Sequence, residues 1–398
     1  MTERQRGLLP RVSPFVLLCT LGGLAIFSTT MSKNPALSLF IRSLGVPEGT
    51  VGFIAAASTV VGIVVSLPAG MLSDLYGRKR VLLAGAFVFA SAPFLYLFVH
   101  SPWQLVLVRV YHGMATAILG PVALAAVADT FEARRGERLA WYSSATMLGR
   151  FVAPTIGGLL IIGQDFRWVY LGCGVAGLLA LLLATHLPLP RQSEASAAAP
   201  TLKGAWQRLR EEASYTVRHR GILMTSLVQA AQYFAFGFLE VYLPLRLAAA
   251  GLKAWQIGPL FTVQVLTTAL SKPILGRLAD RRGRSTLIAA GLASGAAALV
   301  LVSVAQGYVL LAMSTGLFGL GIAAVTASTA ALVSDLAHQD AYGAALGILS
   351  SIMDVGHSTG PMVGGLLVSA FGYGPAFVSV AAVLIVTAVV FLTVVGQH

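Results

Sequence analysis

The chain has 398 residues, of which 57% are hydrophobic and 11% are charged, and its mean hydropathy is +0.81. A soluble globular domain is about 25% charged, so this composition excludes a soluble protein. The net charge of +12 does not indicate nucleic-acid binding, because the 27 basic residues are spread along the chain and form no single patch.

Apolar stretches long enough to cross a bilayer as helices recur from Pro14 almost to the C-terminus. The first is too long for a signal peptide and has no small-residue cleavage site, so we expect an uncleaved span. The sequence thus predicts an all-α membrane protein with 12 transmembrane helices. The predicted spans are residues 14–40, 49–72, 79–99, 103–130, 139–163, 166–187, 221–248, 256–279, 285–306, 308–334, 342–370 and 374–396.

The connections between the predicted spans alternate between basic and nearly uncharged. With the N-terminus inside, 19 Lys and Arg residues fall in cytoplasmic segments, four on the opposite side and four within spans. The positive-inside rule accounts for this alternation and predicts that both termini are cytoplasmic.

One connection, residues 188–220, is much longer than the others. Its second part places Trp206, Leu209, Ala213 and Val217 on one helical face, which predicts an interfacial helix. The predicted domains are therefore an N-terminal six-helix bundle (1–187), a cytoplasmic linker (188–220) and a C-terminal six-helix bundle (221–398).

The two predicted bundles share an internal repeat, which indicates that they have one design. GMLSDLYGRKR at residues 70–80 matches GRLADRRGRST at residues 276–286 with an offset of 206. This offset relates Gly70, Asp74, Gly77, Arg78 and Asp129 to Gly276, Asp280, Gly283, Arg284 and Asp335. An offset of 207 relates Gly149, Ala153, Pro154, Gly157 and Gly158 to Gly356, Gly360, Pro361, Gly364 and Gly365.

The loop G-x-L-x-D-x-x-G-R-[KR] at residues 70–79, repeated at residues 276–285 with Ser285 in the last position, closely resembles the signature of the major facilitator superfamily (MFS), and the resemblance covers essentially the whole chain. LVLVRVYHGMATA, with Arg109 and Gly113, is similar to the span-four pattern of that superfamily. GRFVAPTIGG resembles the span-five pattern of drug:proton antiporters, with Ala153 in place of a glycine, and GHSTGPMVGG has the full pattern.

This resemblance implies the MFS fold, in which two pseudo-symmetric bundles alternate access to a central cavity. It also implies a secondary transporter of the 12-span multidrug efflux branch, with a small-molecule substrate, protons as the coupling ion and a lipid bilayer around it. We expect a monomer in the cytoplasmic (inner) membrane of a bacterium.

The duplicated loop predicts a conformational clasp at the cytoplasmic ends of the helices. Arg78 would pair with Asp129, and Asp74 would face the positive end of span eleven. The second copy, Asp280, Arg284 and Asp335 with Gly276 and Gly283, would mirror it. In the resembled family such a network holds the outward-facing state. The alternative is that the basic residues only set topology.

The Gly and Pro positions of spans five and eleven predict helix hinges or close helix seams, because glycine removes side chains and proline removes a backbone donor. Ordinary packing of small residues is the alternative.

Ionisable residues inside spans are functional candidates, because burying them in lipid is costly. They are Lys33, Arg109, Arg150, Glu240, Lys272 and Asp354, with His112 and His357 beside them. Asp354 lies near the midplane and His357 follows on the same helical face, which predicts proton binding and release. The alternative is a static pair bonded to the backbone or to Arg150.

Lys33 and Glu240 occupy nearly equivalent repeat positions, since the offset aligns Glu240 with Asn34. We expect them to pair or to form a gate across the cavity.

The resemblance gives Arg109 a part in proton movement or in stabilising a cavity carboxylate. Many drug:proton antiporters carry an acid in span one, where this chain has Lys33, so an anionic or zwitterionic metabolite is the alternative substrate. Lys272 lies close enough to the cytoplasmic end to snorkel.

Other functional classes find little support in the sequence. It has no G-x-x-x-x-G-K-[ST] or H-E-x-x-H motif, and the literal G-x-S-x-G at residues 356–360 and G-x-G-x-x-G at residues 172–177 both lie within predicted spans. Cys19 and Cys173 lie in separate predicted helices, so we expect no disulfide or metal site. The sequence predicts a transporter without cofactor or metal and not an enzyme. A non-transporting membrane sensor is a remote alternative.

Overall fold

The computed structural model describes residues 13–131, 134–189, 219–337 and 342–394, except for the side chains of Leu67, Asp74 and residues 342–344. Within these ranges the chain forms helices and no β-strand, and one isolated β-bridge joins Ile162 to Asp165. The predicted all-α class is therefore confirmed. The predicted interfacial helix of the linker lies outside the described residues.

The described helices follow the predicted spans in order. In the first half they are α1 (Pro14–Lys33), α2 (Ala36–Ser43), α3 (Glu48–Tyr76), α4 (Arg78–Leu95) with a short 3-10 turn (Tyr96–Phe98), α5 (Pro102–Thr130), α6 (Arg135–Leu160) and α7 (Arg167–His186). In the second half they are α9 (Arg220–Ala249), α10 (Ala254–Arg282), α11 (Arg284–Val304), α12 (Tyr308–Leu336), α13 (Tyr342–Phe371) and α14 (Tyr373–Val394). The first predicted span is divided into α1 and α2 at Asn34 and Pro35.

Nine segments of the described chain are long and apolar enough to cross a membrane. The helices α6, α10 and α13 are also 26 to 30 residues long, but they carry more Gly, Pro and polar residues. The main contacts between the two halves involve these three helices, since α6 packs along α10 and α13 packs along α3. Twelve crossings and the orientation of the termini stay predictions.

Glycines related by the repeat form the turns between neighbouring helices. Gly77, between α3 and α4, has φ +90°, and Gly283, between α10 and α11, has φ +91°. At the opposite ends of these helices, Gly45 and Gly251 have φ +73° and +89° and are also 206 residues apart. Residues with a Cβ rarely adopt these angles, so the repeat fixes glycine at both ends of the helices.

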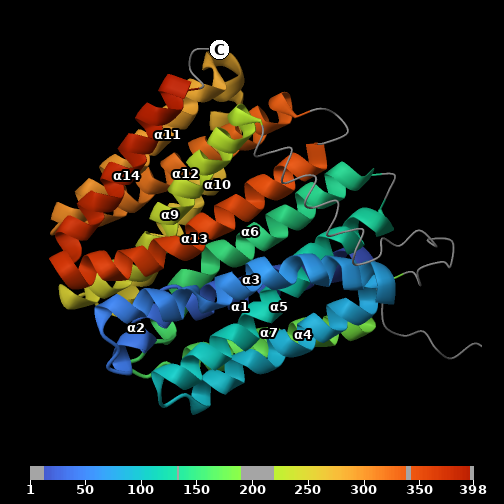
Figure 1. The fold of residues 1–398 in the computed structure, drawn as a ribbon. Coiled ribbons are helices and arrows are strands. Elements are labelled where there is room, and N and C mark those ends of the chain that lie inside the picture. Colours follow the sequence, from blue (N-terminus) through green and yellow to red (C-terminus); the bar gives the residue numbers. More distant parts are fainter. Residues whose placement is uncertain (1–12, 132–133, 190–218, 338–341, 395–398) are drawn as a thin grey trace, which may run out of the picture.

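The two bundles lie side by side and meet along α3–α13 and α6–α10 (Figure 1). Gly52 of α3 packs against the carbonyl of Pro361, and Gly258 of α10 packs against the carbonyl of Pro154, so closely that any Cβ would overlap. The two contacts are related by the repeat, because Gly52 and Gly258 are 206 residues apart and the prolines 207. The bundles thus meet in a pseudo-symmetric seam of bare backbone.

The seam is tight at one end of the molecule only. This closed end contains α2 and the Gly45 and Gly251 turns. Hydrogen bonds across it include Tyr373 OH to Glu48 Oε1 (2.6 Å), Arg42 Nη1 to the Leu245 carbonyl (3.2 Å) and Thr155 to Thr262 (2.8 Å between hydroxyls). At the other end, the basic end with Arg78 and Arg284, Gly70 and Gly276 face open space. Figure 1 shows α3 and α13 separating toward the basic end. If the basic end is cytoplasmic, as predicted, this structure is the inward-facing state.

Candidate functional site

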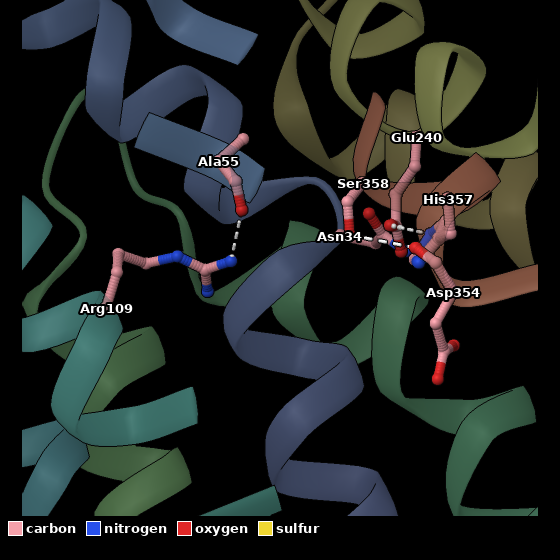
Figure 2. Close-up of polar contacts among 7 residues, drawn as sticks. All are labelled: Asn34, Ala55, Arg109, Glu240, Asp354, His357 and Ser358. Carbon is pink, nitrogen blue, oxygen red and sulfur yellow. Dashed lines mark hydrogen bonds and ion pairs between the residues drawn. The ribbon is translucent and has the colours of Figure 1, made fainter. Parts of the chain in front are cut away.

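A hydrogen-bonded bridge of three side chains joins the two bundles (Figure 2). Asn34 Nδ2, at the α1–α2 break, donates to Glu240 Oε1 of α9 at 2.8 Å. The second carboxylate oxygen of Glu240 lies 3.1 Å from His357 Nε2 of α13. The Glu240 and His357 side chains are each only 15% exposed. We call this trio the Asn34–Glu240–His357 bridge.

The bridge differs from the pairs expected from the sequence. His357 contacts Glu240 and not Asp354, because its ring lies flat against Phe236 (5.3 Å between centroids) and is turned toward α9. Lys33 forms no described ion pair with Glu240; the amide of the next residue, Asn34, takes that place. Asn34 and Glu240 are repeat equivalents, so this hydrogen bond joins corresponding positions of the two halves.

The Asp354 carboxylate points away from the bridge (Figure 2). The side chain is half-buried, and no hydrogen bond or ion pair to its carboxylate occurs among the described residues. It lines a cavity of about 310 Å³ together with Lys33, His357, Thr59 and Thr116. A carboxylate in a polar cavity without a fixed partner is free to bind a proton or a substrate group.

Arg109 of α5 lies beside α3 and lines a small pocket together with Lys33, Asn34, Glu240 and His357. Its side chain is only 2% exposed, and its Nη2 donates to the Ala55 carbonyl at 2.6 Å. Figure 2 shows its guanidinium beside the main chain of Ala55. A main-chain carbonyl accepts its hydrogen bond, and a part of Arg109 in proton movement or in stabilising a cavity carboxylate stays a prediction. His112, one turn later, is also buried and contacts Tyr96 OH at 3.2 Å through Nδ1.

The remaining intramembrane cations face more open surroundings. Lys33 lines the cavity beside Asp354, whereas the Arg150 and Lys272 side chains are exposed. None of the three belongs to an ion pair among the described residues. The described residues also contain no cluster of His, Cys, Asp and Glu that could hold a metal.

The within-bundle part of the predicted clasp is present in both copies. Arg78 Nε lies 2.9 Å from Asp129 Oδ2, and Arg284 lies 2.5 Å from Asp335 and 3.7 Å from Asp280. Asp129 and Asp335 are more than half exposed, so each pair contributes at most about 1 kcal/mol. The side chain of Asp74 lies outside the described residues. A clasp between the bundles therefore stays a prediction.

The predicted hinge and packing positions divide into two groups. Gly149 and Gly157 pack against α1, and Gly356, Gly360 and Gly364 pack against α9 of the same bundle. Gly158 and Gly365 instead contact the opposite bundle. A Cβ on Gly158 would lie 2.5 Å from the Ala254 carbonyl oxygen, and a Cβ on Gly365 would lie 2.9 Å from the Gly49 carbonyl oxygen. In this conformation these glycines allow neighbouring helices to pack closely against each other.

The sequence profile of the Major Facilitator Superfamily matches residues 18–263 and 225–397. The chain belongs to this superfamily. It is 26% identical over 381 residues to the multidrug resistance protein MdtG of Enterobacter lignolyticus, covering 93% of this chain and 88% of MdtG. It is 22% identical over 378 residues to the quinolone resistance protein NorA of Staphylococcus aureus, covering 92% of each. The solved nucleoside transporter NupG superposes with a TM-score of 0.78 at 14% identity, over 96% of this chain and 99% of NupG.

These matches confirm the predicted MFS membership and are consistent with its multidrug efflux branch. The protein is an MFS transporter and not an enzyme. Its candidate substrate site is the cavity that lies between the bridge, Asp354 and Lys33.

The sequence did not predict the roles of three residues at the seam and in the bridge. Gly52 and Gly258 form the seam contacts but lie outside the duplicated motifs; a search for every glycine pair at the 206-residue offset finds them. Asn34 was recognised only as the equivalent of Glu240. Asn34 carries no charge, so the distribution of intramembrane charges does not indicate it, although its amide forms a hydrogen bond between helices.

Proposed function

We propose that this MFS transporter exports amphipathic small molecules in exchange for protons, with Asp354 as the proton-binding group. The observation that carries the proposal is the Asp354 carboxylate, which has no partner among the described residues and lines the cavity next to the Asn34–Glu240–His357 bridge. The multidrug efflux proteins among the relatives support the substrate class.

The geometry suggests how proton binding and conformation are linked. The bridge joins α1, α9 and α13 at the depth of Asp354, and α13 carries both Asp354 and His357. Rocking of the bundles about the closed end moves α13 against α3. Such motion changes the contacts of both groups together. A proton on Asp354 and a substrate in the cavity can then favour different states, which is the requirement for coupled exchange.

A gradient-driven flux assay with an Asp354 variant tests this proposal. Asp354→Asn keeps the size and polarity of the side chain but cannot ionise, so we expect substrate accumulation driven by an imposed proton gradient to fall at least about tenfold. Asp165→Asn, an acid in the connection after α6, is the matched control and should retain wild-type accumulation. Wild-type accumulation in Asp354→Asn would exclude Asp354 as the coupling group.

The second candidate is transport of an anionic or zwitterionic metabolite. Lys33 favours it, because it places a cation in the cavity beside Asp354. Competition of carboxylates or organophosphates with a labelled substrate, lost in Lys33→Gln and retained in Lys272→Gln, would select this candidate over amphipathic drugs.

The cellular setting belongs to the same proposal. We infer a monomer in the cytoplasmic membrane of a bacterium, with the basic end in the cytoplasm. The bacterial efflux relatives and the charge distribution support this setting.

A further inference from the structure

A groove of about 970 Å³ opens at the closed end, between the two bundles and away from the central cavity. Leu39 and Arg42 of α2 form one wall. Lys253 and Trp255 at the start of α10 form the other, and Leu159 and Ile162 at the end of α6 complete it. Its walls therefore come from both halves of the chain.

The groove concentrates positive charge where this protein has little. The predicted outer side carries four basic residues, and two of them, Arg42 and Lys253, line the groove, whereas no acidic residue does. Arg246, by contrast, donates to the carbonyl of Ser303 at 2.8 Å. Arg167 lines a separate pocket together with Asp165.

Neither cation of the groove is neutralised by the described protein. Arg42 donates one hydrogen bond, to the Leu245 carbonyl at 3.2 Å, and a guanidinium has five N–H donors. Among the described residues, neither Arg42 nor Lys253 forms an ion pair. Both side chains are exposed and available to an anion.

Large apolar side chains surround these cations. Ile162 is 67% exposed, Leu159 58% and Trp255 51%. The groove lies at the helix ends, where tryptophan commonly marks the level of the lipid headgroups. A soluble anion needs no such apolar surface, whereas a phospholipid presents a phosphate and acyl chains together.

We propose that the groove binds an anionic phospholipid of the outer leaflet. Its phosphate lies between Arg42 and Lys253, and an acyl chain lies along Leu159, Ile162 and Trp255. Because both bundles supply the walls, separation of the bundles at the closed end breaks the site. The lipid therefore binds the present conformation more tightly and stabilises it. This inference does not depend on proton coupling or on the transported substrate.

The test measures phosphatidylglycerol binding to the purified full chain, reconstituted in phosphatidylcholine with and without phosphatidylglycerol. Each basic residue near a membrane surface changes affinity for anionic lipid by about fivefold. We expect Lys253→Gln to lose about that factor and the Arg42→Gln/Lys253→Gln double variant to lose roughly its square. Arg167→Gln, which removes the same charge from the neighbouring pocket, is the matched control and should bind normally.

Two further variants separate specific lipid binding from misfolding and from a loss of charge alone. Arg42→Lys keeps the charge and should retain most of the binding, whereas Ile162→Asn keeps both cations and should weaken binding. Label distances across the closed end should shorten when phosphatidylglycerol is added to the wild type and not to the double variant. Wild-type binding in the double variant, an equal loss in Arg167→Gln, or displacement of the lipid by inorganic phosphate would overturn the proposal.

Discussion

At the scale of single residues, the Asn34–Glu240–His357 bridge joins polar groups of both bundles next to the central cavity. The Glu240 carboxylate is nearly buried, yet each of its oxygens has a polar partner. Buried charge is tolerated when it is paired and hydrogen-bonded. The partner groups come from α1 and α13, so the bridge satisfies Glu240 only while the helices of both bundles lie together.

Removal of one bridge partner should destabilise the protein. His357→Leu leaves one carboxylate oxygen of Glu240 without its partner, and we expect the free energy of unfolding to fall by about 2 kcal/mol. Denaturant unfolding in detergent measures it, with the exposed His186→Leu as the control. The double variant His357→Leu/Glu240→Leu should recover part of the loss, since both partners are then apolar. Equal stability of wild type and His357→Leu would contradict this role.

The sequence identified the charged residues of the site but not their partners. Depth along a helix follows from counting residues, so Asp354, His357 and Glu240 could be placed at similar depth. Which of them touch depends on the rotation of each helix about its axis. That rotation follows from packing contacts such as His357 against Phe236, which the 206-residue offset does not encode.

At the scale of helices and turns, the duplicated loop sets the backbone conformation of a tight turn and also places charged residues beside it. Gly77 and Gly283 turn the chain from one helix directly into the next with φ near +90°, and Arg78 and Arg284 follow at once. The turn therefore places each arginine beside the aspartate of α5 or α12. The partner aspartates lie 51 residues further along the chain, so each pair forms only because α5 and α12 pack beside these turns.

Alanine at the turn glycine should strain the protein locally. We expect Gly77→Ala to lower the free energy of unfolding by about 1–3 kcal/mol, because a Cβ disfavours this backbone conformation. Thermal unfolding of the purified variant checks this value. Gly136→Ala is the matched control, since Gly136 is helical and has open space around it; an equal loss in both variants would contradict the argument.

At the scale of the whole molecule, the structure combines a tight closed end with an open basic end. The repeat predicted two like bundles, and family membership confirms the fold. The conformational state could not be predicted, because the same sequence must form both states of an alternating-access cycle. Close backbone contacts such as Gly52 with Pro361, together with side-chain hydrogen bonds such as Tyr373 to Glu48, hold the closed end. One buried hydrophobic cluster extends through both bundles, from residues such as Leu37 and Val51 to Leu243 and Ile257, so separation at this end also unpacks apolar contacts.

Proton-coupled exchange is tested most directly by recording pH inside proteoliposomes that contain a trapped pH-sensitive dye while a transported substrate is added outside. We predict that substrate entry drives protons out of wild-type vesicles, so that the interior becomes more alkaline. Vesicles with the Asp354→Asn variant should take up substrate down its concentration gradient without this change in internal pH. Substrate uptake by the wild type at constant internal pH would contradict proton antiport.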